Sequence, residues 1–335
     1  MARAKMQKRA ATGRGPLLAL FVLFADSAAV AELFRMVRWH GGVFCPDCGL
    51  NNVTKYCLYQ KHLQRYTCND CRKTFNDKTG TVLHYRHISL SNWMLALWLF
   101  LCGPLNGVSI RFISQATGQA YKTTYYMMRG IMGRIRGLPE KPLKGACETD
   151  EAYVKAGSKG VALDTNGEDR TVPSRRGLPH GPGRSTFEKN MPMVTIYFQR
   201  ATEDEPDITI MDVPRDGKTL ADMVQERIGP GSTVMTDEHT AYRSLKGRGY
   251  DHHTVNHGEG EYASGERNEI HTNNSECRIG LSKWWLKKHR GVSKWRLAFY
   301  IKSFQFVHNH RHYSLSGRFV ATLAMVLDRF DGVQA

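Results

Sequence analysis

Four of the eight cysteines stand in two pairs whose spacing suits metal binding. The first pair is Cys45-Pro-Asp-Cys48, and after 19 further residues the second is Cys68-Asn-Asp-Cys71. Two residues between paired cysteines let both thiolates reach one ion, and four thiolates form a closed tetrahedral Zn²⁺ site. The spacing therefore predicts a zinc ribbon in which the ion is structural. A redox-active Cys-x-x-Cys pair is the alternative, but two such pairs match the zinc pattern better.

Three acidic residues farther along the chain form a second candidate site. Asp150 lies inside a predicted strand, Asp237 ends another, and Glu276 lies near the start of a late helix. Three carboxylates gathered by such elements would hold two Mg²⁺ or Mn²⁺ ions, because oxygen ligands suit hard cations. Two such ions can activate a water or a 3′-OH for in-line displacement at a phosphodiester.

Each of these acids also has an ordinary structural explanation. Asp150 could end or cap its strand, and its neighbour Glu151, which points to the other face, is the rival ligand. Asp237 could cap the helix that follows, and Glu276 could favour the positive end of its own helix dipole. The three acids together, on these elements and in this order, favour the metal site.

The elements that must position the acids begin at Glu148. The pattern predicts strands at 148–154, 193–199, 208–213, 233–236 and 251–255. Helices are predicted at 218–228, 241–245, 274–288 and 295–308, and a long polar loop at 157–190. Three strands, a helix, a strand, a helix and a strand indicate an α/β domain built on a mixed sheet.

The preceding part of the chain is predicted to be helical on either side of the ribbon. One or two amphipathic helices at 17–37 are expected to pack on the ribbon. Three helices follow at 93–102, capped by Ser91, at 109–116 and at 121–135, with a turn at Gly118. This pattern resembles a helix-turn-helix, although any three-helix unit gives the same pattern. Lys122 and Arg129 on the third helix are candidate DNA contacts.

The charge of the chain favours a polyanionic partner. There are 47 Lys+Arg against 31 Asp+Glu, a net charge of +16 and a pI near 9.6. The segment from Glu148 to Glu276 holds 23 acids and 15 Lys+Arg, net −8, so the rest of the chain is net +24. An acidic middle between two basic arms suits an enzyme that gathers metal ions centrally and holds nucleic acid on both sides. Two unrelated domains would give the same distribution.

The N-terminal apolar run at 17–25 resembles a signal peptide but is interpreted as a helix. Asp26 follows the run directly, and the zinc-type cysteines indicate a reducing compartment. No stretch reaches the roughly 20 apolar residues that a membrane span needs. We therefore expect a cytoplasmic protein without a membrane partner.

The motifs together resemble insertion-sequence transposases of the DDE type, specifically the zinc-ribbon family numbered fifteen ninety-five with its ISXO-like catalytic domain. The resemblance extends from about Phe24 to about Tyr313. Its matching stretches are Arg38-Trp-His-Gly-Gly-Val-Phe-Cys-Pro-Asp-Cys-Gly, Thr149-Asp-Glu-Ala-Tyr-Val, Thr236-Asp-Glu-His-Thr-Ala-Tyr, Val255-Asn-His257 through Glu261-Tyr, His271-Thr-Asn-Asn-Ser-Glu276 and Asn309-His-Arg311.

The resemblance implies a ribonuclease-H-like sheet in which the first and fourth strands are neighbours. It also implies that Asp150, Asp237 and Glu276 are the catalytic carboxylates, with Lys283 on the DNA-end side. His257 and His271 are expected to support the site, to contact DNA or simply to pack. The sequence departs from the family at Cys277, where a glycine is usual, and the loop 157–190 varies widely in such proteins.

The C-terminal arm is basic and aromatic. From Cys277 to Leu327 there are ten Lys+Arg and no acid. The aromatic side chains there are expected to be mostly core, because they recur at helical spacing. The expected DNA contacts on this arm are Lys283, Lys287, Lys288 and Arg290.

The sequence thus predicts five segments: a basic arm and helix at 1–39, the zinc ribbon at 40–80, a helical DNA-binding domain at 81–145, a ribonuclease-H-like catalytic domain at 146–313 and a C-terminal tail at 314–335. The expected activity is metal-dependent cleavage and strand transfer at the ends of an insertion sequence. Its expected partners are double-stranded DNA and further copies of the chain. A nuclease that never joins DNA and an inactive zinc-ribbon regulator are the alternatives; the presence of all three acids disfavours the regulator.

Overall fold

The computed structural model describes residues 16–84, 86–157, 187, 190–215, 217–256, 259–260 and 262–327. The chain divides into two compact units, one within residues 1–99 and 320–334 and the other within 100–319. Nearly all of the loop predicted at 157–190 lies outside the described residues, as does His257.

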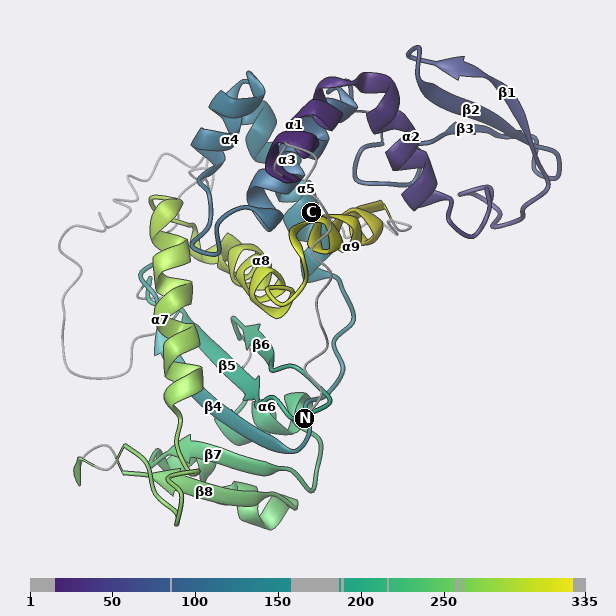
Figure 1. The fold of residues 1–335 in the computed structure, drawn as a ribbon. Coiled ribbons are helices and arrows are strands. Elements are labelled where there is room, and N and C mark those ends of the chain that lie inside the picture. The colour runs from purple at the N-terminus through teal and green to yellow at the C-terminus, as the bar shows by residue number, and fades with distance from the viewer. Residues whose placement is uncertain are drawn as a thin grey trace, which may run out of the picture. The chain divides into compact units, whose positions relative to one another are not determined.

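The first unit contains a small antiparallel sheet and several helices. Its sheet has the order β1-β2-β3 (Figure 1). The elements are α1 (Pro16–Ala25), α2 (Ser27–Arg38), β1 (Val53–Tyr59), β2 (Leu63–Cys68), β3 (Thr74–Asn76) and α3 (Leu90–Leu97). Asp26 begins α2 because its Oδ1 accepts hydrogen bonds from the backbone N–H groups of Ala28 and Ala29. The two helices predicted at 17–37 are therefore present.

A buried carboxylate ties α2 to the sheet. Asp77 is fully buried and accepts hydrogen bonds from Trp39 Nε1 at 2.9 Å, Tyr66 OH at 3.3 Å and the backbone N–H of Gln64 at 2.6 Å. Arg35, on α2, forms an ion pair with it at 3.4 Å. Buried charges are tolerated when they are paired and hydrogen-bonded in this way. The expectation that the N-terminal helices pack on the ribbon is thus met by α2.

The second unit is built on a five-stranded mixed sheet. Its strands are β4 (Ala146–Tyr153), β5 (Met193–Gln199), β6 (Ile208–Asp212), β7 (Thr233–Asp237) and β8 (Asp251–Val255). The order is β6-β5-β4-β7-β8. β5 pairs antiparallel with both β4 and β6, whereas β7 is parallel to both β4 and β8. The first and fourth strands of the predicted set are therefore neighbours.

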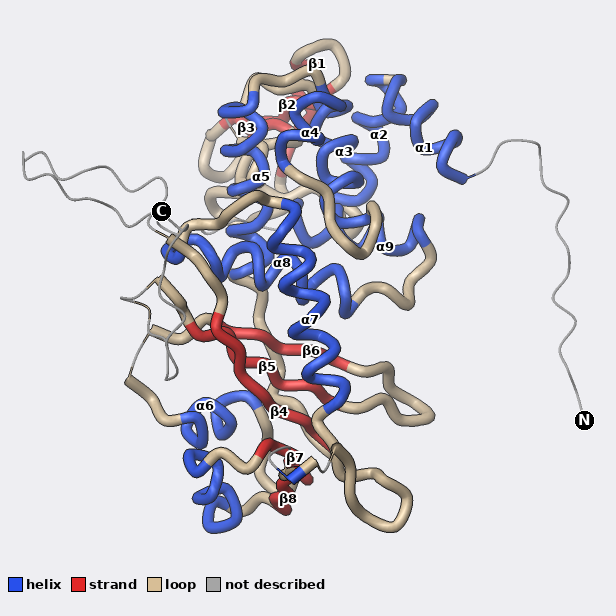
Figure 2. Tube along the Cα trace, turned by 90° about the vertical axis from the view of Figure 1, so that its left-hand side faces the viewer, coloured by secondary structure: helices blue, strands red, loops and turns tan. Residues whose placement is uncertain are grey.

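Helices cover both faces of this sheet (Figure 2). On one face, α6 (Leu220–Arg227) and the 3₁₀ helix η2 (Thr240–Arg248) close an apolar core. Members of that core are Cys147, Tyr197, Ile210, Val224, Val234, Tyr242 and Leu245. On the opposite face, α7 (Asn273–Lys288) packs against β4 and β5. The two faces of β4 consequently have different environments.

Helix α8 (Leu297–Asn309) covers the edge strand β6 and completes its hydrogen bonding. The amide of Asn309 accepts from the backbone N–H of Thr209 at 3.0 Å and donates to its carbonyl at 2.8 Å. Gln305 Oε1 accepts from the backbone N–H of Met211 at 2.8 Å. An uncovered edge strand presents unpaired backbone groups, and these two amides take the place of a sixth strand.

The remaining helices are η1 (Trp98–Cys102, a π-helical turn), α4 (Ile110–Thr117), α5 (Tyr121–Arg136), η4 (Lys294–Arg296) and α9 (Leu315–Leu327). Gly118 ends α4 with φ of 65°, as the predicted turn requires. The predicted cap of the helix expected at 93–102 is wrong. Ser89, not Ser91, caps α3, because the residue whose side chain reaches the N–H three positions on is Ser89. In the described residues, no helix combines the length and the apolar character needed to cross a membrane.

Candidate functional site

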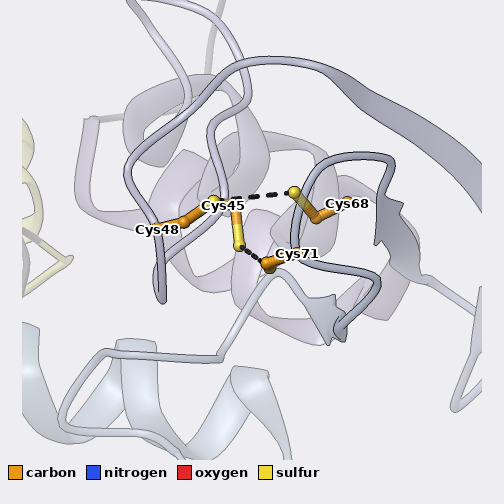
Figure 3. Close-up of side chains that lie close together, drawn as sticks. All are labelled: Cys45, Cys48, Cys68 and Cys71. Atoms are coloured by element: carbon orange, nitrogen blue, oxygen red, sulfur yellow. Dashed lines mark hydrogen bonds between the residues drawn. The ribbon is translucent and has the colours of Figure 1, made fainter.

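The four predicted zinc ligands come together at one end of the small sheet (Figure 3). The Sγ atoms of Cys45 and Cys71 lie 3.6 Å apart, as do those of Cys48 and Cys68. All four sulfur atoms lie within 4.8 Å of one another. A tetrahedral Zn²⁺ ion with Zn–S bonds of about 2.3 Å requires sulfur atoms about 3.8 Å apart. The thiol donor set and its spacing therefore fit Zn²⁺.

The backbone favours the thiolate form of one cysteine in particular. The N–H groups of Cys71 and Asp70 lower the pKa of the Cys68 thiol to about 7, whereas burial and the neighbouring thiols raise the pKa of Cys48 and Cys71. Trp39, Tyr66 and Phe75 pack into the same core as Cys45 and Cys68. All eight cysteines of the chain are free of disulfide bonds. The cluster is thus both the ligand set and part of the core of its sheet.

Strands β4 and β7 bring two of the predicted acids to one end of the larger sheet. Their parallel pairing aligns Glu148 with Met235. Asp150 and Asp237 each follow this last pair of the two strands by two residues. Successive strand residues alternate between the two faces, so Glu148, Asp150, Met235 and Asp237 share a face.

The third acid, Glu276, comes from the first turn of α7, the helix that packs on β4 and β5. It is exposed, and the hydroxyl of Thr272 donates a hydrogen bond to its Oε1 at 3.1 Å. The oxygens of these three carboxylates are more widely spaced than the thiolates of the ribbon. They do not form a group in which all ligand atoms lie within 4.8 Å of one another.

The electrostatic environment of Asp150 reflects the other acids. Burial and the negative charges of Glu151, Asp237 and Glu276 raise its pKa to about 7, against the opposing effect of the Glu151 backbone N–H. That N–H donates to Asp150 Oδ1 at 2.7 Å. Like charges gathered in one place disfavour the ionised form. A cation at this point would relieve that repulsion, and carboxylate oxygens are the ligands that hard divalent ions prefer.

The rival ligand Glu151 lies on the opposite face of β4. Its carboxylate accepts a hydrogen bond from the hydroxyl of Tyr242 at 2.7 Å. Tyr242 belongs to the core beneath α6 and η2. Glu151 is therefore held by a buried partner on the face of the sheet away from α7.

Asp237 does not cap the helix that follows it. Its Oδ1 accepts from the backbone N–H of His239 at 3.1 Å. His239 itself occupies the N-cap position of η2, where its Nδ1 accepts from the N–H of Ala241 at 3.1 Å. The capping role that was the alternative explanation for Asp237 thus belongs to His239.

A further acid, which the sequence did not single out, joins β4 to α7. Glu148 is fully buried, and its Oε2 accepts from the backbone N–H groups of Asn274 at 2.9 Å and Ser275 at 3.1 Å. Its Oε1 accepts from Asn274 Nδ2 at 2.7 Å and from Arg200 Nε at 2.7 Å. The only sequence signal was the strand alternation that puts Glu148 on the same face as Asp150.

Three of the predicted DNA-binding cations gather where α7 passes the end of β4. Lys283, Lys287 and Arg290 line a cavity of about 400 Å³ together with Lys155, which follows β4. Lys155, Lys283, Lys287 and Arg290 are all exposed. Lys155 was not predicted, because its position beside α7 depends on how the helix packs on the sheet. The four cations form a positive surface, here called the α7 cationic patch.

The other predicted cations lie outside this patch. Lys288 lines a second cavity, of about 610 Å³, with Arg290, Arg111 and Tyr121. Lys122 is exposed and Arg129 half-buried on α5, and neither lines the two cavities. His271 lies next to Arg200, which also bonds to Glu148. Arg200 Nη2 is 3.1 Å from His271 Nδ1.

The aromatic residues of the C-terminal arm divide as expected. Trp285, Tyr300, Phe304 and Phe306 are buried. Trp284, Trp295 and Tyr313 are exposed, and Lys287 Nζ lies 4.6 Å from the centroid of the Trp284 ring. Most of the aromatic side chains are therefore core.

Both parts of the chain match known transposase domains. A family model described as the ISXO2-like transposase domain, of the IS1595 family, matches residues 142–309, and one described as the transposase zinc-ribbon domain matches residues 25–74. The chain therefore belongs to this family of insertion-sequence transposases. The resemblance inferred from the sequence is confirmed.

A curated relative comes from a mobile element. The chain is 37% identical over 285 residues to an uncharacterized protein in transposable element ISH50 of Halobacterium salinarum. The alignment covers 84% of this chain and 90% of the relative. No solved structure matches the chain.

Proposed function

We propose that this protein cleaves the ends of its own insertion sequence and joins them to target DNA, using two Mg²⁺ or Mn²⁺ ions held by Asp150, Asp237 and Glu276. The observation that carries the proposal is the gathering of these acids. Asp150 and Asp237 follow the last pair of the parallel strands β4 and β7 by two residues, and Glu276 lies in the first turn of the helix that packs on β4. Such a pair of ions would activate the attacking oxygen and stabilise the charge of an in-line displacement.

The chain's own residues would hold the DNA beside that site. The α7 cationic patch, Lys155, Lys283, Lys287 and Arg290, begins two turns along α7 from Glu276 and is suited to phosphate groups. Lys288 would extend this contact, and Lys122 and Arg129 would serve a separate contact on α5. The ribbon's zinc is structural, because its four thiolates leave no open ligand position.

The strand order supports a ribonuclease-H-like fold for residues 146–313. The first strand, β4, is central, with the mutually antiparallel strands β5 and β6 on one side and the parallel strands β7 and β8 on the other. We also propose the other domain boundaries that the sequence predicts. Helices α4 and α5 would then bind DNA as a helix-turn-helix. Since two element ends must be joined together, we also propose that the chain acts as a dimer or larger assembly on DNA. Full activity from a strictly monomeric complex would contradict this.

The decisive experiment mixes purified protein with labelled DNA that carries the terminal inverted repeats flanking its gene, plus Mg²⁺ or Mn²⁺. The wild type should nick the end and join it to a target. Asp237→Asn and Asp150→Asn should bind the same DNA but cleave it at least about 10³-fold more slowly, because each removes a ligand from ions that contribute several kcal/mol.

Glu151→Gln is the matched control, since this neighbouring acid faces Tyr242. Its cleavage rate should stay within about tenfold of the wild type. Cleavage without joining by the wild type would favour the nuclease. Binding without cleavage by every protein tested, the wild type included, would favour the regulator. A loss in Glu151→Gln equal to that in Asp150→Asn would overturn the ligand assignment.

A further inference from the structure

The helix that carries Glu276 begins without a cap of its own. Thr272 occupies the N-cap position of α7 but makes no side-chain capping hydrogen bond. The first N–H groups of a helix have no partner within the helix and need an acceptor. In α7 that acceptor is a carboxylate from another element, Glu148 of β4, which accepts from the N–H groups of Asn274 and Ser275.

Glu148 also fixes the chain leading into α7. Arg200, at the end of β5, donates from Nε to Glu148 at 2.7 Å, and its Nη1 and Nη2 donate to the carbonyls of Glu269 at 2.5 Å and His271 at 3.0 Å. The segment before the helix and the first turn of the helix are therefore held by one ion pair, of which the carboxylate is buried and the guanidinium half-buried. The negative charge also lies at the positive end of the helix dipole, where it is favourable.

The spacing links this contact to the proposed metal ligands. Glu148 precedes Asp150 by two residues on one face of β4, and Asn274 precedes Glu276 by two residues on α7. The hydrogen bonds between Glu148 and Asn274 thus join β4 to the first turn of α7, the two elements that carry Asp150 and Glu276.

We propose that Glu148 is a positioning residue that sets the distance between Asp150 and Glu276 by capping α7 from the neighbouring strand. This rests on the proposed metal site. A buried ion pair is seldom the most stabilising solution, because apolar residues of similar volume often serve stability as well or better. Of the four hydrogen bonds onto this carboxylate, three come from α7, which carries Glu276, and the carboxylate itself belongs to β4, which carries Asp150; these bonds instead define geometry.

The test measures Mn²⁺ binding to the full-length, zinc-loaded protein by the electron paramagnetic resonance signal of free Mn²⁺. Wild type should show binding that Asp237→Asn abolishes. Glu148→Gln should weaken that binding by about 10- to 100-fold, the usual effect of removing a group that orients a metal ligand. The amide places a donor where only donors approach, so two or more of the four hydrogen bonds are lost.

Asn274→Ala is a milder second variant, since it removes only the bond from Asn274 Nδ2 to Glu148. It should weaken Mn²⁺ binding less than Glu148→Gln, and the double variant should be no weaker than Glu148→Gln alone, because both act through one contact. Independent, additive effects would overturn the proposed linkage.

Glu140→Gln controls for a general loss of stability. Glu140 accepts from Lys302 at 2.7 Å and Gln305 at 2.5 Å and pairs with Arg227 at 3.2 Å, so it is a partly buried acid of the same unit whose partners here lie on α8 and α6. Mn²⁺ binding should be unchanged in this variant. If Glu148→Gln binds Mn²⁺ like Glu140→Gln, Glu148 is only structural. If wild type has no Mn²⁺ binding that depends on Asp237, the proposed metal site fails and this inference fails with it.

Discussion

At the scale of single residues, two adjacent acids on β4 have different environments. Burial first, and then the negative charges of Glu151, Asp237 and Glu276, raise the pKa of Asp150 to about 7. Glu151 faces Tyr242 and the apolar core. The difference arises from strand alternation, which sends neighbouring side chains to opposite faces.

A half-buried histidine, whose two ring nitrogens are both buried, should make the protein sensitive to mild acid. His289 lies against Phe100, Trp285 and Tyr300, and burial lowers its pKa to about 4. In the unfolded chain a histidine has a pKa of about 6.5. The unfolded state therefore takes up a proton first as the pH falls. Stability that is fully present above pH 6.5 is lost between pH 6.5 and 4.

We predict that His289→Phe loses less stability than the wild type when the pH falls from 7.5 to 5. The difference in the free energy of unfolding should be about 1–2 kcal/mol. Urea titrations at both pH values measure it, and any loss of zinc affects both proteins alike. Parallel losses in the two proteins would show that His289 already ionises in the folded state.

At the scale of elements, α8 acts as a substitute strand for the sheet. Its residues Gln305 and Asn309 hydrogen-bond with the outer edge of β6 through side-chain amides. This explains the Asn309-His-Arg311 motif structurally. Arg311 pairs with the buried Asp207 just before β6, so both ends of the motif hold the edge strand.

Replacing Asn309 with alanine should therefore destabilise the second unit. Two hydrogen bonds are lost and the N–H and C=O of Thr209 are left without them, which costs about 2–4 kcal/mol. Gln115→Ala, at an exposed amide on α4, should change the free energy of unfolding by less than about 0.5 kcal/mol. Urea unfolding followed by tryptophan fluorescence measures both, and equal effects would mean that the edge needs no cover.

At the scale of the whole molecule, a measurement that follows both units at once shows whether they unfold independently. The zinc cluster forms much of the core around Trp39, Tyr66 and Phe75, whereas the sheet of the second unit has an apolar core of its own. Small metal-stapled modules owe their folding free energy to the metal.

Zinc removal should consequently unfold the ribbon and spare the larger sheet. In Cys68→Ser, amides of β2 should exchange with solvent at least about 100-fold faster, while those of β4 and β5 keep their protection. Hydrogen exchange read by mass spectrometry gives both values in one experiment. Loss of protection in β5 would show that the units fold as one.

The charge of the whole chain should appear in the salt dependence of DNA binding. Each Lys or Arg that neutralises a phosphate adds about 0.9 to the slope of log K against log salt. Lys155→Ala and Lys283→Ala, in the α7 cationic patch, should each lower that slope by about one. Lys246→Ala, exposed on η2 at the other face of the sheet, should leave it unchanged. Equal slopes for all three variants would remove the patch from the DNA interface.

The sequence alone determined the features that depend on local pattern. Cysteine spacing defined the zinc ligands, because a Cys-x-x-Cys pair is a local geometry. The five strands, of which β7 ends with Asp237, and helix α7, which bears Glu276, were predicted within a few residues, since side-chain periodicity and turns are also local. The cap of α3 was misplaced by two residues because three nearby serines and asparagines compete for that role.

Only the tertiary structure decided what joins distant segments. Glu148 looked like an ordinary strand residue until α7 was seen to begin on it, 126 residues later. Lys155 entered the α7 cationic patch, and Asn309 met the edge of β6, for the same reason. Such contacts depend on how a helix packs across a sheet, and packing follows from the shape and burial of whole faces rather than from the spacing of neighbours in the chain.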